Sequence, residues 1–487
     1  MQIVWSRRGG RPDLTHVGSA HDESELAVLM EAARERMAAG QGELDLGLDG
    51  EQRRVGRPLT STGSQMRHLW QALNLAYEAV GLAGAAADEV FRDLVLARVV
   101  EPTSKVDSIR VLAEVGYPTV SYPTLKRHLR TWSAEGFREL LSAALAAHAQ
   151  VGPKSLVLYD VTTLWFETDK ADEFRVPGFS KERRLEPQIT IGLLTDAAGF
   201  PLMVNAFEGN AAETTTMIPT IKAFLETHQL DEVVVVADAG MVCEANKAAI
   251  EAEGLRFVIG EKIPNVPYQL LKWQREHPGQ EPPDGLVLTQ PWPPGPNETR
   301  RTQVRYYQYR ADRARRTLRG IDTQVAKAER AVAGKVPVKR NKYVALNGGT
   351  RKVDRDLEAK HRTLAGWKAY VTNIDDPTPE LVIGAYHQLW HIEKSFRMSK
   401  SDLAARPVYA RTRDSIEAHL TIVFAALAVS RWIETTTGWS IKKFVRTTRC
   451  YRTTYIKVGN QTLPAEEPLP DDLATALDKI RTRSAAH

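Results

Sequence analysis

The sequence predicts a protein of the α/β class, in which a helical region precedes a mixed sheet. Two observations carry this prediction. Across residues 65–150, apolar residues recur every three or four positions, which is typical of helices. After Pro153 the pattern changes to short strands that alternate with helices around the wholly apolar run 233–237, which is typical of a sheet covered on both faces.

Length and composition exclude several classes of protein. With 487 residues, the chain is too long for one ordinary core, and 43% hydrophobic with 26% charged residues excludes wholesale disorder or a collagen-like fibre. Cys243 and Cys450 cannot make a disulfide framework or a four-thiolate zinc site, so a reducing compartment is expected. The best apolar run, residues 422–429, is short for a membrane span, and the first ten residues lack a signal peptide's apolar core. We therefore expect no membrane partner.

The charge of the chain is unevenly distributed. The net charge is only +5, yet residues 300–370 hold 20 Lys+Arg against 6 Asp+Glu, a balance of +14. The remaining residues hold 45 basic and 54 acidic side chains. A phosphate-binding surface concentrates positive charge in this way, although a solvated basic helix pair does so too.

The helical region contains a candidate helix-turn-helix. Residues 107–115 predict a helix that stops at Gly116, and Ser121 with Pro123 predicts the start of a second helix over 124–132. The second helix presents Lys126, Arg127 and Arg130. A DNA-reading hairpin has this form, and so does any helical hairpin with a basic exposed face.

The strands that follow have a recognisable order. Residues 155–166, 188–195 and 201–207 predict a three-stranded antiparallel meander, followed by helix 213–228, strand 233–237, helix 244–253 and strand 256–260. This is the element order of the ribonuclease H-like fold. The alternation then breaks and returns as helices at 378–400 and 415–434, which indicates an inserted subdomain.

The sequence therefore predicts a ribonuclease H-like core with an inserted subdomain, preceded by an all-α DNA-binding region. The expected parts are an N-terminal region (1–64), the helical DNA-binding region (65–150), the first part of the core (151–262), the inserted basic subdomain (263–377), the closing helices of the core (378–435) and a C-terminal tail (436–487).

Three acidic residues are candidates for a metal site. Asp160 lies within a strand, and Asp238 directly follows the apolar strand 233–237. In the expected sheet the first and fourth strands can be neighbours, and two converging carboxylates are stable when a divalent cation neutralises them. Either residue alone could instead cap a turn. The third candidate is Glu393, in the predicted helix 386–400.

The helix 386–400 carries a stripe of polar residues. Tyr386, Leu389, Glu393 and Lys400 are spaced to share one face, which Arg397 joins four positions after Glu393. The stripe is compatible with an ordinary salt-bridged surface or with a metal-binding carboxylate flanked by phosphate-binding cations.

At these residues the sequence resembles the DDE transposases of bacterial insertion sequences, most closely the insertion-sequence-four type with a β-rich insertion. The signature of that type is Tyr, two residues, Arg, three residues, Glu, six residues, Lys; Tyr386, Glu393 and Lys400 fit it, but Leu389 stands at the Arg position. The segments 159–167, 178–183 and 236–241 and the pair Gly209-Asn210 also resemble blocks of this type. The resemblance covers residues 151–432.

The resemblance implies a function and a site. Asp160, Asp238 and Glu393 would be catalytic and would bind Mg²⁺, with Mn²⁺ as a possible substitute. Tyr386, Arg397 and Lys400 would contact DNA, with Arg397 able to replace the missing Arg. The expected partners are the element ends and the target DNA, with a homodimer in the synaptic complex, in the bacterial cytoplasm at the nucleoid. The alternatives are a non-mobile nuclease of the same fold and a DNA-binding protein that no longer uses its catalytic core.

Other residues are weaker candidates. Members of the type commonly cleave through a DNA hairpin, which requires an aromatic ring to stack a flipped base, and Trp273, Trp292 and Trp367 could do so or could be packing residues. His387 and His391 have a metal-like spacing but are expected to point away from Glu393.

Overall fold

The structure is a computed structural model that describes residues 1–5, 13–20, 23–38, 60–118, 120–168, 170–178, 185–230, 233–240, 244–296, 298, 300–335, 341–347, 350–458 and 461–485. The chain divides into two units, residues 1–60 with 457–461, and residues 61–456 with 462–487. The first unit contains the antiparallel hairpin β1 (Gln2–Trp5) and β2 (Asp13–His16), and the helix α1 (Glu23–Ala38).

The second unit begins with the helical region. The helices are α2 (Arg67–Ala79), α3 (Leu82–Ala86), α4 (Glu89–Val100), α5 (Ser108–Val115), α6 (Tyr122–Ser133) and α7 (Glu135–His148). The predicted hairpin is present: α5 ends at Gly116, and the Ser121 hydroxyl caps α6 by accepting from the Thr124 N–H. The prediction of a helical region ahead of the sheet is confirmed.

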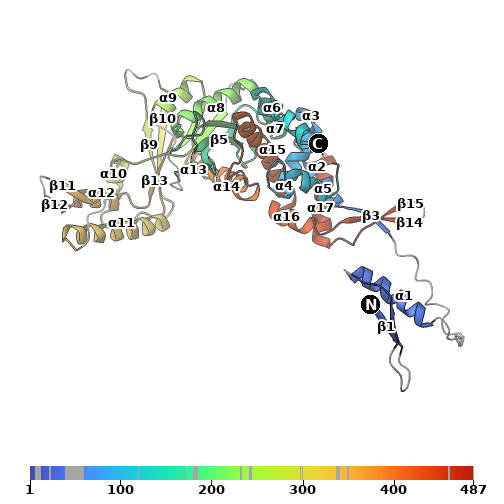
Figure 1. Ribbon diagram of the computed structural model, residues 1–487. Coiled ribbons are helices and arrows are strands. Elements are labelled where there is room, and N and C mark those ends of the chain that lie inside the picture. The colour runs from blue at the N-terminus through green and yellow to red at the C-terminus, as the bar shows by residue number, and fades with distance from the viewer. Residues whose placement is uncertain are drawn as a thin grey trace. The chain divides into compact units, whose positions relative to one another are not determined.

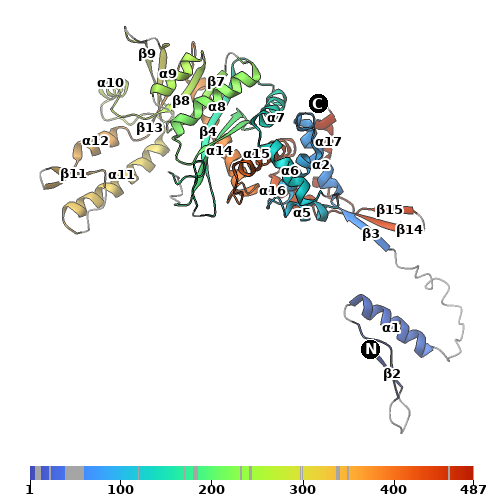
Figure 2. The same ribbon diagram turned by 45° about the horizontal axis from the view of Figure 1, so that its top comes forward.

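A mixed sheet of eight strands forms the centre of the second unit. Figures 1 and 2 show the sheet between the helical region and α11. Its order is β6-β5-β4-β7-β8-β13-β10-β9. The strands are β4 (Ser155–Trp165), β5 (Gln188–Asp196), β6 (Pro201–Glu208), β7 (Val233–Ala237), β8 (Arg256–Glu261), β9 (Val287–Trp292), β10 (Gln303–Tyr309) and β13 (Trp367–Thr372).

The first five strands have the predicted ribonuclease H-like arrangement. Strands β4, β5 and β6 form an antiparallel meander, while β7 is parallel to β4 and β8 is parallel to β7. The helices α8 (Glu213–His228) and α9 (Glu244–Ala252) provide the connections into β7 and β8. The buried strand β7 explains the run of four valines, because strands covered on both faces need no alternation of polar residues.

The segment 263–377 extends the core sheet. Strand β13 pairs antiparallel with β8, and β10 and β9 follow, so three strands of this segment are hydrogen-bonded into the same sheet. Its remaining elements are α10 (Tyr268–Glu276), α11 (Ala311–Val332), β11 (Val344–Asn347), β12 (Thr350–Val353) and α12 (Arg355–Thr363). The expected subdomain is thus continuous with the core through its strands, because β8 would otherwise be an unpaired edge.

The closing helices are interrupted where one helix was predicted. They are α13 (Pro379–His387), α14 (Leu389–Arg397), the π-helical turn η1 (Met398–Asp402) and α15 (Arg413–Thr437). At Gln388 the backbone tightens: its N–H donates to the Ala385 carbonyl, and its carbonyl accepts from the His391 N–H at 2.8 Å. Such three-residue bonds separate α13 from α14.

Helix α15 is the central helix of the second unit. It contacts α2, α4, α6, α7 and β6, and one hydrophobic core includes residues of the helical region, the sheet and α15. By length and composition α15 could cross a membrane, although the short apolar run 422–429 within it did not indicate this. Of the most apolar 18-residue stretch of α15, however, 94% is buried inside the protein. Its apolar surface is therefore used for packing.

The segment 436–487, which was expected to be a tail, is folded. It contains α16 (Ile441–Thr448), β14 (Thr453–Val458), β15 (Gln461–Ala465) and α17 (Asp471–Ala485). Strand β14 lies between β15 and β3 (Thr60–Gln65), and α17 packs against α2 and α15.

Candidate active site

Asp160 and Asp238 lie at neighbouring strands of the sheet. The parallel pairing of β4 with β7 runs as far as Leu158 opposite Val236. Asp160 continues β4 two residues later, and Asp238 directly follows Ala237, the last residue of β7. On β4, Asp160 shares a face with Leu158 and Thr162, because residues two apart in a strand point the same way.

That face is the one covered by α14. The opposite face of β4 packs on α8, where the Tyr159 hydroxyl donates to the Thr216 hydroxyl at 3.0 Å. On the Asp160 face, Thr162 and Leu164 line a small cavity of about 40 Å³ with Phe396 and Lys400. Strand β4 thus directs Asp160 towards the helix that carries Glu393, and Figure 2 shows α14 beside β4.

Asp238, Glu393, Tyr386 and Lys368 form a charged cluster. The Tyr386 hydroxyl donates to Asp238 Oδ1, and Lys368 Nζ donates to the Tyr386 oxygen at 2.9 Å. Burial, followed by the hydrogen bond to Asp238 and the charges of Asp238 and Glu393, raises the pKa of Tyr386. Burial lowers the pKa of Lys368, and the carboxylates of Asp238 and Glu393 oppose that shift. Both acidic residues therefore act on the same two side chains.

Helix α14 is fixed to the turn between β5 and β6. The buried Ser395 hydroxyl donates to the Gly199 carbonyl at 2.6 Å, and Arg431 of α15 donates to the Ala198 carbonyl. Lys394 forms an ion pair with Glu434 of α15 at 2.8 Å. These contacts hold the helix from both sides and so position Glu393 relative to β4.

The three acidic residues suit a hard divalent cation in chemistry. They offer only carboxylate oxygens, the ligands that Mg²⁺ prefers, and Asp160 and Asp238 come from neighbouring strands. Within the part of the chain that the structure describes, no group of three or more His, Cys, Asp or Glu side chains is close enough to hold a metal ion. The three residues fit such a site in chemistry, and Asp238 and Glu393 share Lys368 and Tyr386 as neighbours.

The structure also places the other residues of the predicted stripe. Leu389, at the position where the resemblance expects Arg, is buried in the hydrophobic core. Arg397 and Glu393 are both exposed on α14, and Lys400 lies in the π-helical turn η1. A guanidinium at position 389 would be costly to bury, so Arg397 is the nearest exposed arginine on this helix to take its place.

The two candidate histidines lie on either side of the junction between α13 and α14. His387 is exposed at the end of α13, and His391 lies partly buried in the first turn of α14. Burial lowers the pKa of both, and nearby cations add to the shift: Lys368 for His387, and Arg431 for His391.

The three candidate tryptophans differ in exposure. Trp273 and Trp367 are each 9% exposed and belong to the packing of α10 and β13, whereas Trp292 at the end of β9 is 39% exposed. Trp292 lines a cavity of about 640 Å³ together with Ala239 and Gly240, the two residues that follow Asp238. The Arg305 guanidinium lies 4.0 Å from the centre of the Trp292 ring. Of the three, only Trp292 is available for stacking.

The predicted recognition helix α6 presents its cations to solvent. Lys126, Arg127 and Arg130 are exposed, while Leu125, Leu129 and Trp132 are buried. The alternation follows the helical period, so the basic face is opposite the packed face.

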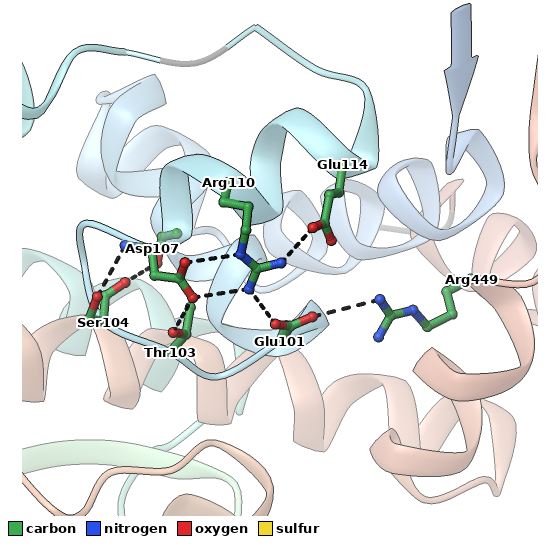
Figure 3. Close-up of polar contacts among 8 residues, drawn as sticks. Glu101, Thr103, Ser104, Asp107, Arg110, Glu114 and Arg449 are labelled. Atoms are coloured by element: carbon green, nitrogen blue, oxygen red, sulfur yellow. Dashed lines mark hydrogen bonds and ion pairs between the residues drawn. The ribbon is translucent and has the colours of Figure 1, made fainter. Parts of the chain in front are cut away.

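A hydrogen-bonded network fixes the preceding helix α5, as Figure 3 shows. The Arg110 guanidinium contacts Asp107 at 2.9 Å, Glu101 at 2.5 Å and Glu114 at 2.6 Å. Hydrogen bonds from Arg110 and Thr103 lower the pKa of Asp107 to about 2. Arg449, at the end of α16, reaches Glu101 at 3.6 Å, so the network joins the hairpin to the C-terminal segment.

Asp88 joins α4 to the recognition helix and gives a stability prediction. Its Oδ1 accepts from the N–H groups of Val90 and Phe91, and its Oδ2 pairs with His128 and accepts from Trp132 Nε1, both at 2.9 Å. An Asp88→Asn variant keeps the cap but turns an amide towards these donors. We expect a loss of roughly 1–3 kcal/mol for each orphaned donor, measured by denaturant unfolding at pH 7.

The pH dependence of stability gives a second measurement on the Asp88→Asn variant. Burial raises the pKa of Asp88, but hydrogen bonds from Trp132 and His128 outweigh it, so the pKa is lowered overall. The stability from Asp88 is then complete above its unfolded pKa of about 3.9 and is lost as the pH falls through the lower folded value. Asp88→Asn should lack that loss, whereas Glu89→Gln, at the exposed neighbouring residue, should behave as wild type. Equal stability of Asp88→Asn and wild type at pH 7 would contradict this role.

Lys368 is the residue of the cluster that the sequence did not indicate. A lysine among the apolar and aromatic residues of strand 367–372 is a signal of an unusual environment, but the sequence does not say which side chains surround it. Pairing of β13 with β8 decides that.

Comparison with known proteins identifies a family for this chain. The family model described as "Transposase DDE domain" matches residues 152–429, more than half of the chain. No curated protein matches significantly. Among solved structures, the chain is similar to a piggyBac transposase in a synaptic complex with hairpin DNA, with 12% identity and a TM-score of 0.37 over 79% of this chain and 70% of that one. The chain belongs to the family of proteins that carry the transposase DDE domain.

Proposed function

We propose that this protein is a transposase of the bacterial insertion-sequence-four type that binds the terminal inverted repeats of its element and carries out DNA strand cleavage and strand transfer. The observation that supports this most strongly is that Asp160 lies on β4 and Asp238 directly follows the neighbouring strand β7, while α14, the helix that carries Glu393, packs on β4. The active form would be a homodimer that synapses two ends, in the cytoplasm at the nucleoid.

The acidic residues would hold Mg²⁺, or Mn²⁺ in its place. When bound, two such cations activate the attacking oxygen and stabilise charge at phosphorus. Tyr386 was expected to contact DNA, but its side chain is buried and its hydroxyl donates to Asp238, so it would orient that carboxylate instead. Arg397 and Lys400 follow Glu393 in α14 and η1, where they would bind the phosphates flanking the cut. Trp292 would stack a base flipped from a hairpin end.

Two further surfaces would bind DNA. The exposed cations Lys126, Arg127 and Arg130 of α6 suit a groove or its phosphates. Helix α11 is longer and its outward face carries Arg315, Arg316 and Arg319, followed by Lys327 and Arg330. Exposed cations at helical spacing form a stripe that can follow a phosphate backbone.

One experiment separates this function from its alternatives. Purified protein is incubated with labelled duplexes that end in the inverted repeats flanking its gene, with and without Mg²⁺. A transposase cleaves the ends and joins them to a target, a non-mobile nuclease only cleaves, and a DNA-binding protein that has lost its catalysis only binds. Binding without cleavage at any Mg²⁺ or Mn²⁺ concentration would contradict the proposal.

Neutralising the exposed arginines of α11 gives a quantitative prediction. We expect the triple variant Arg315→Gln, Arg316→Gln, Arg319→Gln to bind DNA roughly 10-fold or more weakly at low salt, because each phosphate contact contributes a released counterion. The slope of log affinity against log salt should become shallower by up to about 3. Fluorescence anisotropy over a salt series measures both quantities.

The matched control removes charge elsewhere. Lys479 and Arg481 are exposed on α17, outside the proposed surface, and their replacement by Gln should leave the salt slope unchanged. Partly buried arginines of the same window, such as Arg305 with Glu261 and Arg313 with Gly366, are poor test sites because their loss would disturb packing. An unchanged slope in the α11 variant would show that DNA binds elsewhere.

A further inference from the structure

We propose that Lys368 is a positioning residue of the active site: through the Tyr386 hydroxyl, it fixes the carboxylate of Asp238. This inference rests on the proposed function, because it gives Lys368 a role in the same reaction. Its basis is the chain of contacts from Lys368 Nζ to the Tyr386 oxygen, at 2.9 Å, and from the Tyr386 hydroxyl to Asp238 Oδ1.

The direction of this chain is fixed by chemistry. An ammonium group only donates, so the Tyr386 oxygen must accept from Lys368 and its single proton is left for Asp238. A donor that itself accepts a charge-assisted hydrogen bond is polarised and becomes a stronger donor. Lys368 thus strengthens and orients the bond that holds one oxygen of Asp238.

The ring of Tyr386 is held where this chain requires it. It crosses β8 at Gly260, where a Cβ atom would stand only 2.7 Å from the ring. Two residues of β13, the neighbour of β8, also contact the Tyr386 ring. The Tyr370 ring packs against it edge-to-face with the two centroids 5.0 Å apart, and Lys368 Nζ lies 4.0 Å from the centre of the Tyr386 ring. The strands β7, β8 and β13 are consecutive in the sheet, so Tyr386 spans from Lys368 to Asp238 across one intervening strand.

Within the described residues, the ammonium group of Lys368 is hydrogen-bonded to the Tyr386 hydroxyl and not to a carboxylate. In the described part of the chain, no carboxylate lies within 4.0 Å of its ammonium, although Asp238 and Glu393 are its acidic neighbours. A lysine used only for stability would be expected to form a direct ion pair or to extend its ammonium into solvent. Here a partly buried ammonium bonds to a neutral hydroxyl beside two carboxylates.

Two other roles make different predictions. A lysine that bound the DNA phosphate directly would act independently of Tyr386, so the effects of removing the two groups would multiply. A lysine that only supported the fold would, when removed, weaken cation binding and cleavage together. A positioning residue acts through Tyr386 and leaves the carboxylates able to bind the cation.

The experiment uses the full chain and five variants: Lys368→Met, Lys368→Arg, Tyr386→Phe, the double variant Lys368→Met with Tyr386→Phe, and the control Lys222→Met. Lys222 on α8 is an exposed lysine paired with Glu253 at 2.7 Å, outside the site. Cleavage rates are measured at saturating Mn²⁺ and DNA, and the Mn²⁺ midpoint is measured separately as the rise in Tm of the free protein.

We expect Lys368→Met to cleave about 10- to 100-fold more slowly, with an unchanged or lower Mn²⁺ midpoint because a positive charge has left the site. Lys368→Arg should recover part of the rate, since a guanidinium also donates to the phenol. The double variant should be no slower than Tyr386→Phe alone, and the Tm losses of the single variants should likewise not add. Lys222→Met should match wild type in rate and in Mn²⁺ midpoint.

Three results would overturn the inference: wild-type cleavage by Lys368→Met, rate effects that multiply in the double variant, or a raised Mn²⁺ midpoint in Lys368→Met. Failure of the proposed function has a different signature, which is a wild-type protein that cleaves no DNA end. In that case the Tm values alone test the coupling of Lys368 to Tyr386. A Tm loss in the double variant equal to the sum of the two single losses would overturn the coupling, and a smaller loss would support it.

Discussion

The variants Asp160→Asn, Asp238→Asn and Glu393→Gln are each expected to cleave and join DNA at least ~10³-fold more slowly than wild type, because loss of one ligand forfeits several kcal/mol of charge stabilisation at phosphorus. Binding to the element ends in the absence of Mg²⁺ should change little, since none of the three residues belongs to α6 or α11, which carry the exposed cations. A labelled-end cleavage assay and an anisotropy titration on the same preparations measure the two effects.

The control for these variants is Glu226→Gln, an exposed carboxylate on α8 that faces away from the site. It should retain wild-type cleavage. Thermal unfolding of each variant guards against loss of fold, and Asp160 is the most demanding case because it is partly buried within β4 and its Oδ1 accepts from the Val161 N–H. If Asp160→Asn cleaved at the wild-type rate, the assignment of the acidic residues would be wrong.

Gly199→Ala is expected to destabilise the protein and to lower cleavage. Gly199 has φ +80°, and a Cβ atom there would stand 2.7 Å from the carbonyl oxygen of His391, two residues before Glu393. The left-handed backbone costs an alanine about 1–2 kcal/mol, and overpacking against a backbone atom adds roughly 1–3 kcal/mol. Because the clash is with α14 itself, the displacement moves the helix that carries Glu393.

Gly254→Ala separates the two contributions. Gly254 has φ +76°, almost the same as Gly199, but nothing lies within 4 Å of the position where its Cβ would be. It should therefore show only the backbone cost and should cleave normally. Denaturant unfolding of both variants gives the difference, and equal losses of stability with equal activity would show that α14 does not depend on the turn between β5 and β6.

Local patterns predicted most elements of the core. The meander 155–207, the apolar strand 233–237 and the hairpin around Gly116 appear where the sequence placed them. Their signals are strong because turn residues, caps and periodicity agree at each of them. The break at Gln388 was missed, since residues 378–400 have a helical pattern throughout, whereas α13 packs on β7, β8 and β13 and α14 packs on β4.

Long-range pairing could not be predicted in the same way. The segment 263–377 was expected to form a separate subdomain, yet β13, β10 and β9 join the core sheet, and residues 436–487 pack on the helical region. In both cases a segment covers a strand edge or an apolar helix face that is left exposed once the core has formed. The edge of β8 and the outer side of α2 belong to distant parts of the sequence, so the local patterns of residues 263–377 and 436–487 do not indicate them.

By itself, the sequence determined the class of fold and the positions of Asp160, Asp238 and Glu393 in their elements, because strand and helix periods are local properties of the chain. The tertiary structure alone decided which side chains meet there. Lys368 reaches Tyr386 only because β13 is the neighbour of β8, and Tyr386 reaches Asp238 only because Gly260 leaves room for its ring. Tyr386 is 18 positions from Lys368 and 148 from Asp238, and both contacts depend on strand order and packing, which the periodicity of a single segment does not contain.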